Sequence, residues 1–226
     1  MTPDPIATLD PAARAALGKV LELLAEERAS VSSVVDERAW RVHVADSLTG
    51  LEVPELAGAG RIADVGAGAG FPGLALAAAL PGAQIDLIES IGRKCAFMTK
   101  AIEVSGIGNA EVLNTRSEDL AVGDGRERYD AVTARAVGRL STLAELASPL
   151  LKPNAVLIAW KGKRDEDEEQ QLLNASEDLV MRPESILDVG DRAGSQHRHL
   201  HIIRKVGPTP ASLPRKPGIA KKRPKG

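Results

Sequence analysis

The chain contains few aromatic residues and a single cysteine. Two tryptophans, two phenylalanines and one tyrosine are the only aromatic side chains among its 226 residues. So small a number excludes an aromatic platform on which single-stranded bases stack. The lone Cys95 excludes a disulfide framework, and it favours a reducing compartment, which we expect to be the cytoplasm.

Long apolar runs, a targeting segment and a metal-ligand cluster are also lacking. The longest apolar run, Leu74–Leu80, is far too short to cross a membrane. The first residues have neither the basic nor the apolar part of a secretory signal. His197, His199 and His201 alternate, but the sequence offers no further cluster of ligands. We therefore expect no membrane span, no secretory signal and no metal site.

The formal net charge of −2 conceals a strong asymmetry along the chain. Residues 204–226 hold eight of the 29 basic residues and none of the 31 acidic ones, so the rest of the chain is acidic. Residues 207–226 are also rich in proline, and this composition predicts a disordered basic tail. Such a tail either contacts nucleic acid through charge alone or only improves solubility, and composition does not separate the two.

One segment, Asp64–Gly73, is more informative than any other. Its sequence, Asp-Val-Gly-Ala-Gly-Ala-Gly-Phe-Pro-Gly, lies between two apolar runs. This order predicts a strand, a glycine turn and a helix, with Pro72 in the first helical turn, where its missing N–H is harmless. Gly66, Gly68 and Gly70 have no side chains, so a ligand can lie directly on the backbone.

A carboxylate follows at the spacing typical of a nucleotide-binding βαβ unit. Glu89 ends the next apolar run, residues 84–89, about 20 residues beyond the glycine turn. At the tip of the second strand, a carboxylate holds the two ribose hydroxyls of a nucleotide. The chain is therefore expected to bind a molecule that contains adenosine.

Strand-like and helix-like segments alternate from residue 61 onward. The predicted strands are 61–65, 84–89, 110–114, 129–134, 155–160, 184–190 and 198–205. The predicted helices are 72–80, 91–105, 139–150 and 165–175, preceded by helical patterns at 11–29 and 36–51. This pattern indicates a doubly wound α/β sheet that is parallel except for an antiparallel strand at its end. We expect an N-terminal helical extension (1–58), a nucleotide-binding domain (59–206) and the tail (207–226).

The glycine turn by itself leaves two classes of nucleotide open. Gly68–Gly73 also satisfies G-x-G-x-x-G, the fingerprint of nicotinamide dehydrogenases. Two observations argue against a dehydrogenase. The first strand of a dehydrogenase is normally apolar at its end, whereas this one ends in Asp64. The sequence also lacks a catalytic Tyr/Lys or His/Asp pair. The two adjacent closing strands are typical of the methyltransferase variant of the doubly wound fold.

With these motifs in place, residues 38–205 resemble the bacterial small-subunit ribosomal RNA guanine-N7 methyltransferases, also called the glucose-inhibited division protein B family. The resemblance is carried by His43-Val-Ala-Asp46-Ser-Leu, Asp64–Leu74, Leu87–Ser90, Arg93-Lys94, Ala134–Ala136, Ala159–Gly162 and Arg198–Leu200. It implies a Rossmann-like class I methyltransferase sheet of seven strands, the last one antiparallel, with an N-terminal helical extension. The proline-rich basic tail lies outside the family's common pattern.

The resemblance implies S-adenosylmethionine as the cofactor. The family's cofactor contacts fall here on Gly66, Phe71, Ser117, Glu118 and Arg135. In this fold variant Asp64 orients the glycine turn or contacts the methionine amine, and Glu89 holds the ribose. The predicted cofactor-binding residues are therefore Asp64, Gly66, Gly68, Gly70, Phe71, Glu89, Ser117, Glu118 and Arg135.

The implied partner is 16S ribosomal RNA or the small ribosomal subunit, with methyl transfer to N7 of one guanine. N7 carries a lone pair and no proton, so an in-line displacement needs no general base. Arg135 and Lys161, at the ends of two predicted strands, are the catalytic candidates. The predicted RNA-binding residues are Arg41, Arg93, Lys94, Lys161, Arg198 and His199. Nothing in the sequence demands more than a monomer.

Three other functions stay open at this point. The chain could be a methyltransferase of the same fold that acts on a small molecule or a protein. It could be a non-catalytic nucleotide-binding or ribosome-assembly factor, or a nicotinamide dehydrogenase. The labelled product, turnover and the bound nucleotide distinguish these alternatives.

Overall fold

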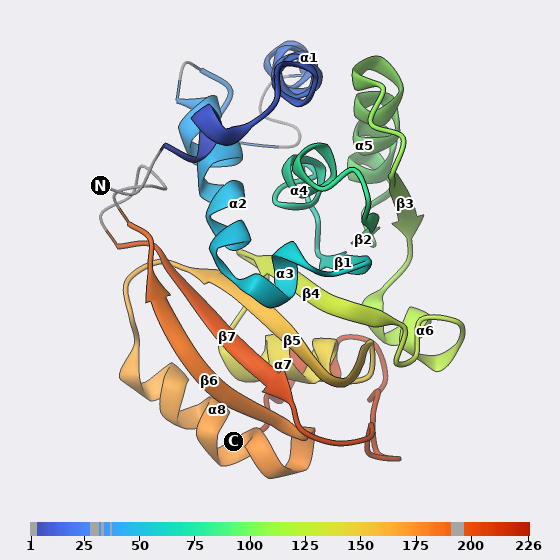
Figure 1. The fold of residues 1–226 in the computed structure, drawn as a ribbon. Helices are drawn as coiled ribbons and strands as arrows, with labels where there is room; N and C mark the ends of the chain where they lie inside the picture. Colours follow the sequence, from blue (N-terminus) through green and yellow to red (C-terminus); the bar gives the residue numbers. More distant parts are fainter. Residues whose placement is uncertain (1–3, 28–31, 33, 37, 191–196) are drawn as a thin grey trace.

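A single sheet runs through the centre of the computed structural model, which describes residues 4–27, 32, 34–36, 38–190 and 197–226 (Figure 1). Its strands are β1 (Arg61–Val65), β2 (Gln84–Glu89), β3 (Ala110–Asn114), β4 (Tyr129–Arg135), β5 (Leu151–Lys161), β6 (Met181–Asp188) and β7 (His199–Lys205). They lie in the order β3-β2-β1-β4-β5-β7-β6. β7 is antiparallel to both of its neighbours, and the other pairs are parallel. The predicted seven-stranded doubly wound sheet is therefore confirmed.

Two strands begin earlier than the sequence predicts. β5 starts at Leu151 and not at 155, because Lys152, Pro153 and Asn154 interrupt its apolar pattern. Asn154 has a φ of 68°, and the register of β4 on β5 shifts nearby. β6 starts at Met181 and not at 184, and its pairing with β7 is irregular just after Pro183. Backbone pairing continues through such irregularities, whereas the apolar alternation stops at them.

Helices cover both faces of the sheet (Figure 1). On one side α1 (Pro11–Glu27) packs against α4 (Gly73–Ala79) and α5 (Gly92–Ser105). On the other side α7 (Leu140–Ala147) packs against α8 (Glu166–Leu179), and α6 (Ser117–Val122) contacts α7. Each side has its own buried apolar cluster, as a doubly wound sheet requires. Within the described ranges, no helix is long and apolar enough to cross a membrane.

The two largest fully buried side chains both have a polar anchor. The Trp160 indole Nε1 donates to the carbonyl of Asp46 at 2.8 Å. The Tyr129 hydroxyl donates to the Asp86 carboxylate at 2.9 Å, and Asp86 also accepts from Arg61. Burial and the neighbouring Asp86 carboxylate raise the pKa of Tyr129, so the phenol keeps the proton that it donates.

The N-terminal extension lies on the sheet as a series of helical segments (Figure 1). The predicted helix 11–29 corresponds to α1, and residues 28 and 29 lie outside the described residues. The predicted helix 36–51 corresponds to consecutive helical segments that run without a break from Trp40 to Glu52 and differ in their hydrogen-bonding pattern. These are η2 (Trp40–Ala45), α2 (Asp46–Leu48) and η3 (Thr49–Glu52), followed by α3 (Pro54–Ala57), while η1 (Pro5–Thr8) precedes α1. Val44 and Leu48 of this stretch are buried.

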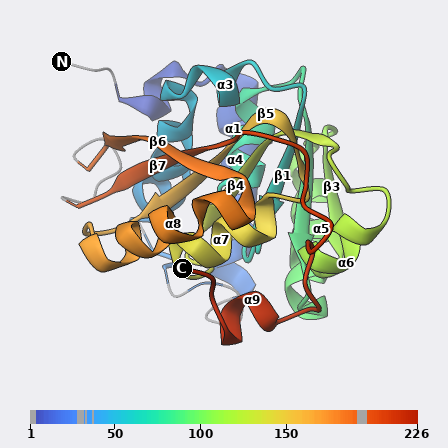
Figure 2. The ribbon, with the colours of Figure 1, turned by 90° about the horizontal axis from the view of Figure 1, so that it is seen from below.

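Residues 207–226 follow a packed course, where the sequence predicts a disordered tail (Figure 2). They include the short helix α9 (Ile219–Lys222). Arg215 pairs with the buried carboxylate of Glu145 in α7, and Lys225 pairs with Asp178 in α8. The basic tail is therefore held by carboxylates of the acidic domain, a complementarity that the tail's own composition does not reveal.

Gly50 tests the packing of the extension on the sheet. A Cβ at this position would lie 2.6 Å from the Trp160 ring and 2.9 Å from Leu56. We expect Gly50→Ala to lower the free energy of unfolding by about 1–3 kcal/mol through overpacking, measured by urea denaturation. Gly82→Ala is the matched control, since a Cβ there meets nothing within 4 Å. Equal stability of the two variants would contradict this packing.

Candidate nucleotide-binding site

A cavity of about 310 Å³ opens at the carboxyl ends of the central strands. Its lining includes Val65 at the end of β1, Gly66 directly after it, and Ile88 and Glu89 of β2. β2 and β3 lie on one side of β1 and β4 on the other, so the strand order reverses at this point. Doubly wound sheets bind their ligands at such a switch point, and the volume is within the usual range of about 300–1,000 Å³ for small-molecule sites.

The glycine turn connects β1 and α4, where the sequence predicts it. Gly66, Gly68 and Gly70 have φ values of 70°, 62° and 88°, in the left-handed region that favours glycine. The N–H groups of Gly66 and Ala67 donate to the carbonyl of Ile88 at 2.9 and 3.1 Å. The turn is thereby attached to the end of β2, beside the cavity.

Asp64 is fully buried beneath the glycine turn. Its Oδ2 accepts from the backbone N–H of Gly73 at 2.9 Å, and its Oδ1 accepts from the Thr133 hydroxyl at 3.0 Å. These bonds join β1 to β4 and to the start of α4, and they correspond to the first of the two roles that the sequence left open for Asp64, orienting the turn. Burial raises the pKa of Asp64 to about 6, although both hydrogen bonds oppose the shift.

Glu89 lines the cavity at the end of β2. Its Oε2 accepts from the N–H of Gly68 at 3.2 Å, and its Oε1 accepts from the N–H of Ile91 at 2.9 Å. The ammonium of Lys94 lies 3.9 Å from Oε2. Each carboxylate oxygen has a second lone pair, so the oriented carboxylate can still accept from ligand hydroxyls.

Ser117 and Glu118 line the opposite end of the cavity, at the start of α6. The Ser117 hydroxyl donates to Oε2 of Glu118 at 3.2 Å. Oε1 of Glu118 accepts from the N–H of Gly218 at 2.8 Å. Gly218, Ala220 and Lys221, all in the C-terminal segment, also line the cavity.

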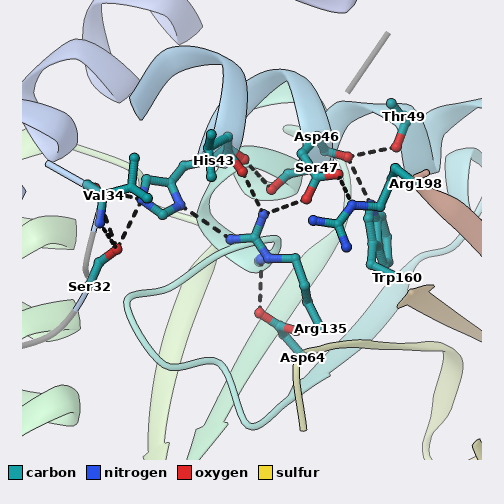
Figure 3. Close-up of polar contacts among 12 residues, drawn as sticks. Ser32, Val34, His43, Asp46, Ser47, Thr49, Asp64, Arg135, Trp160 and Arg198 are labelled. Atoms are coloured by element: carbon teal, nitrogen blue, oxygen red, sulfur yellow. Dashed lines mark hydrogen bonds and ion pairs between the residues drawn. The ribbon is translucent and has the colours of Figure 1, made fainter. Parts of the chain in front are cut away.

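The extension meets the glycine turn through a pair of stacked rings. His43 lies on Phe71 with ring centroids 5.0 Å apart and an interplanar angle of 19°. The Nε2–H of His43 donates to the carbonyl of Val34 at 2.9 Å, and Nδ1 accepts from Nη2 of Arg135 at 3.4 Å (Figure 3). Burial lowers the pKa of His43, which favours this neutral ring.

Asp46 of the extension brings together two arginines that the sequence assigns to different roles (Figure 3). Its side chain is only 1% exposed, and its Oδ2 accepts from Nη1 of Arg135 at 2.7 Å. Its Oδ1 lies 2.7 Å from Nε of Arg198. Arg135 also donates to the carbonyl of Val42 at 3.0 Å. In this structure Arg135 thus joins the end of β4 to the extension.

Lys161 is bound at the end of β5. Its ammonium forms an ion pair with Glu168 of α8 at 2.6 Å and donates to the carbonyl of Gly138 at 3.0 Å. The same carboxylate accepts from the N–H of Leu140 at 2.6 Å. Lys161 therefore connects β5, α8 and the start of α7, and its predicted catalytic role stays a prediction.

The other predicted RNA-binding residues differ in exposure and in the polar contacts that they form. Arg41 and Arg93 are exposed, and among the described residues neither has an ion pair. Nδ1 of His199 donates to backbone carbonyls, including that of Gly162 at 3.1 Å. Burial lowers the pKa of His201, on the same strand, to about 4. Within the ranges that the structure describes, no group of His, Cys, Asp and Glu could hold a metal ion.

The predicted cofactor residues fall into two groups. Gly66, Glu89, Ser117 and Glu118 line the cavity. Asp64, Gly68, Gly70, Phe71 and Arg135 are not part of its lining and lie in the adjoining turn and strands. The lining fits an adenosine, because one carboxylate stands ready for ribose hydroxyls and another for an amino group.

Sequence reasoning missed the cavity-lining residues of the C-terminal segment. Gly218, Ala220 and Lys221 belong to a stretch that the sequence predicts to be disordered. The available signal was the charge asymmetry, since a basic tail on an acidic domain has carboxylates to pair with.

The sequence is similar to a family of ribosomal RNA methyltransferases. The model of the family described as rRNA small subunit methyltransferase G matches residues 18–200. A relative of that name from Pelotomaculum thermopropionicum is 37% identical over 197 residues, which cover 86% of this chain and 82% of the relative. A Rubrobacter xylanophilus relative of that name is 41% identical, covering 80% of this chain and 71% of its own. The Bacillus subtilis relative of that name is 34% identical, with 88% and 84% covered.

Solved structures share the fold at low identity. A SAM-dependent methyltransferase from Aquifex aeolicus matches with a TM-score of 0.55 and 19% identity, covering 76% of this chain and 94% of that chain. A SAM-dependent O-methyltransferase from Thermotoga maritima matches with a TM-score of 0.59 and 15% identity, covering 85% and 72%. These likenesses support the class I methyltransferase fold predicted from the sequence.

The buried Asp64 should leave a signature in the pH dependence of stability. Its pKa is about 6 in the folded chain and 3.8 ordinarily, so the folded state binds more protons between these values. Stability from this group is therefore lost as the pH rises from about 4 to 6. Relative to Asp64→Asn, the native chain should lose up to about 3 kcal/mol of unfolding free energy over that interval.

The measurement is urea unfolding of both chains at a series of pH values. Asp119→Asn is the matched control, because Asp119 is an exposed carboxyl in α6. A difference between native chain and Asp64→Asn that stays constant from pH 4 to 6 would contradict the raised pKa of Asp64.

Proposed function

The chain belongs to the rRNA small subunit methyltransferase G family, and on that premise we propose that it methylates N7 of a guanine in 16S ribosomal RNA. It is an S-adenosylmethionine-dependent methyltransferase of ribosomal RNA, as the sequence predicts. The guanine, its N7 atom and the residues that act on them belong to the proposal. The observation that carries it is the cavity at the switch point, lined by Gly66, Glu89 and Glu118.

The cofactor supplies a methyl group on a positively charged sulfur. In the proposed site, the two backbone donors that orient Glu89 leave its outer lone pairs for the ribose hydroxyls. Glu118 accepts from the adenine amine, and the Gly66 backbone lies beside the methionine portion. Asp64 acts through the turn, because its bond to Gly73 fixes where the glycine backbone runs.

Methyl transfer to guanine N7 requires no acid or base from the side chains. N7 has a free lone pair and carries no proton, so no residue has to accept a proton from it. The reaction then depends on alignment of N7, the methyl carbon and the sulfur. The carboxylates of Glu89 and Glu118 are already occupied by backbone donors, which agrees with binding roles.

Arg135 is better described as a positioning residue than as a group that touches the reacting atoms. Its guanidinium bonds to Asp46 and the Val42 carbonyl, and it is 13% exposed. We propose that it holds the extension over the glycine turn, where the guanine has to enter. Its direct contact with cofactor or guanine stays a prediction.

The RNA contacts are proposed on the exposed cations. Arg41 and Arg93 are free of ion pairs among the described residues and can bind phosphates directly. Lys161 and Arg198 are bound to Glu168 and Asp46, so they would have to share these carboxylates with a phosphate.

The reaction is tested with radiolabelled S-adenosylmethionine and small ribosomal subunits from a strain that lacks the protein. We expect label in a single nucleoside of 16S RNA, identified after digestion as 7-methylguanosine. Naked 16S RNA in a parallel reaction shows whether the assembled subunit is required. Cofactor binding without labelled RNA would reject the proposed substrate, and label in another nucleoside would reject N7.

Glu89→Gln tests the location of the cofactor. An amide has one acceptor oxygen where two backbone donors now meet a carboxylate. We expect the affinity for S-adenosylmethionine to fall by about tenfold or more in titration calorimetry. Glu111→Gln is the control, since Glu111 is an exposed carboxylate on neighbouring β3. Unchanged affinity in Glu89→Gln would place the cofactor elsewhere.

A further inference from the structure

The C-terminal segment forms one wall of the cavity at the end where Glu118 lies. Gly218, Ala220 and Lys221 line it together with Val137 and Leu146 from the turn after β4 and from α7. Figure 2 shows the segment leaving β7, passing α6 and reaching α9 near α7 before it ends beside α8. The cavity therefore contains parts of the chain that are far apart in sequence.

Strong contacts fasten the chain just ahead of this wall. At the start of the segment the fully buried Lys205 donates to Glu127 at 2.8 Å and to the Thr209 hydroxyl at 2.6 Å. Further along, Arg215 forms a two-pronged ion pair with Glu145, whose side chain is only 2% exposed. Removing one partner of such a buried pair leaves an uncompensated charge, so these contacts hold the segment in place.

The wall also forms a hydrogen bond with the carboxylate of Glu118. The N–H of Gly218 donates to Oε1 of Glu118 at 2.8 Å, and the Thr142 hydroxyl donates to the carbonyl of Ala220 at 3.3 Å. Gly218 has a φ of 81°, a conformation that favours glycine. Glu118 is 8% exposed, so its orientation is set by these neighbours and by Ser117.

We propose that residues 217–223 are a permanent wall of the cofactor cavity, closing its adenine end and orienting Glu118 toward the adenine amine. The proposal rests on the proposed function, because it takes the adenosine half of S-adenosylmethionine to lie in this cavity. Glu118 keeps one free lone pair on each oxygen after its bonds to Gly218 and Ser117. Val137, Leu146 and Ala220 supply apolar surface on which the base packs. The basic tail is thus a part of the cofactor site.

The test compares two shortened chains. A chain ending at Lys216 lacks Gly218, Ala220 and Lys221 but keeps the Arg215–Glu145 pair. A chain ending at Arg223 keeps the whole wall and is the matched control. Calorimetry measures the affinity of each for S-adenosylmethionine and for 5′-methylthioadenosine, which lacks the amino-acid portion. Thermal unfolding of both chains is recorded in parallel.

We expect the chain ending at Lys216 to lose about tenfold or more in affinity for both ligands by similar factors. The wall contacts only the adenosine half, so removing the amino-acid portion should not change the loss. The chain ending at Arg223 should bind like the full chain. Full affinity in the chain ending at Lys216, or a loss seen only with S-adenosylmethionine, would overturn the proposal.

Glu89→Gln separates this proposal from the proposed function. If Glu89→Gln binds weakly while the chain ending at Lys216 binds normally, the cofactor site stands and the wall is rejected. If Glu89→Gln binds normally, the ligand lies outside this cavity and both proposals fail.

A full-length variant covers the case in which the chain ending at Lys216 does not fold. Ala220→Leu adds bulk to a buried residue of the lining, and Ala211→Leu adds the same bulk at an exposed position of the same segment. We expect Ala220→Leu alone to weaken 5′-methylthioadenosine binding by about tenfold, measured at a temperature at which both leucine variants are folded. Equal affinity of the two leucine variants would overturn the wall.

Discussion

The buried carboxylate of Asp46 is the contact on which the arrangement of the extension depends. The carboxylate forms ion pairs with Arg135 at the end of β4 and with Arg198 just before β7. The backbone carbonyl of Asp46 accepts a hydrogen bond from the indole of Trp160 in β5. A carboxylate with 1% exposure is stable only when it is paired, so the three strands and the extension stabilise one another. The extension thereby lies over the glycine turn, with His43 stacked on Phe71.

Three carboxylates in and beside the cavity are each held by a different part of the chain. Asp64 ties the glycine turn to β4 and α4, Glu89 is held by donors from that turn, and Glu118 is held by the C-terminal segment. The site is therefore prearranged by backbone hydrogen bonds, which suits the proposed transfer to N7, a reaction for which alignment matters most.

The charge asymmetry of the chain is largely used within the molecule. Lys205, Arg215 and Lys225 pair with carboxylates of the domain, and the tail lies on that surface. Lys216, Lys221 and Lys222 have no ion pair among the described residues, so positive charge remains near the cavity. The acidic domain in this way carries a basic surface beside the cavity.

The amino-acid sequence was enough to predict the order of strands and helices, the glycine turn and the carboxylate at the end of β2. Each of these depends on residues that are neighbours in the chain. Tertiary structure alone decided that Arg135 faces Asp46, that Lys161 faces Glu168 and that residues 207–226 are packed. Gly218 and Glu118 are 100 residues apart, so neither contributes to the local pattern of the other. A segment whose composition is typical of disorder becomes ordered when a surface distant in sequence supplies carboxylates for its basic side chains. Only the folded chain contains that surface.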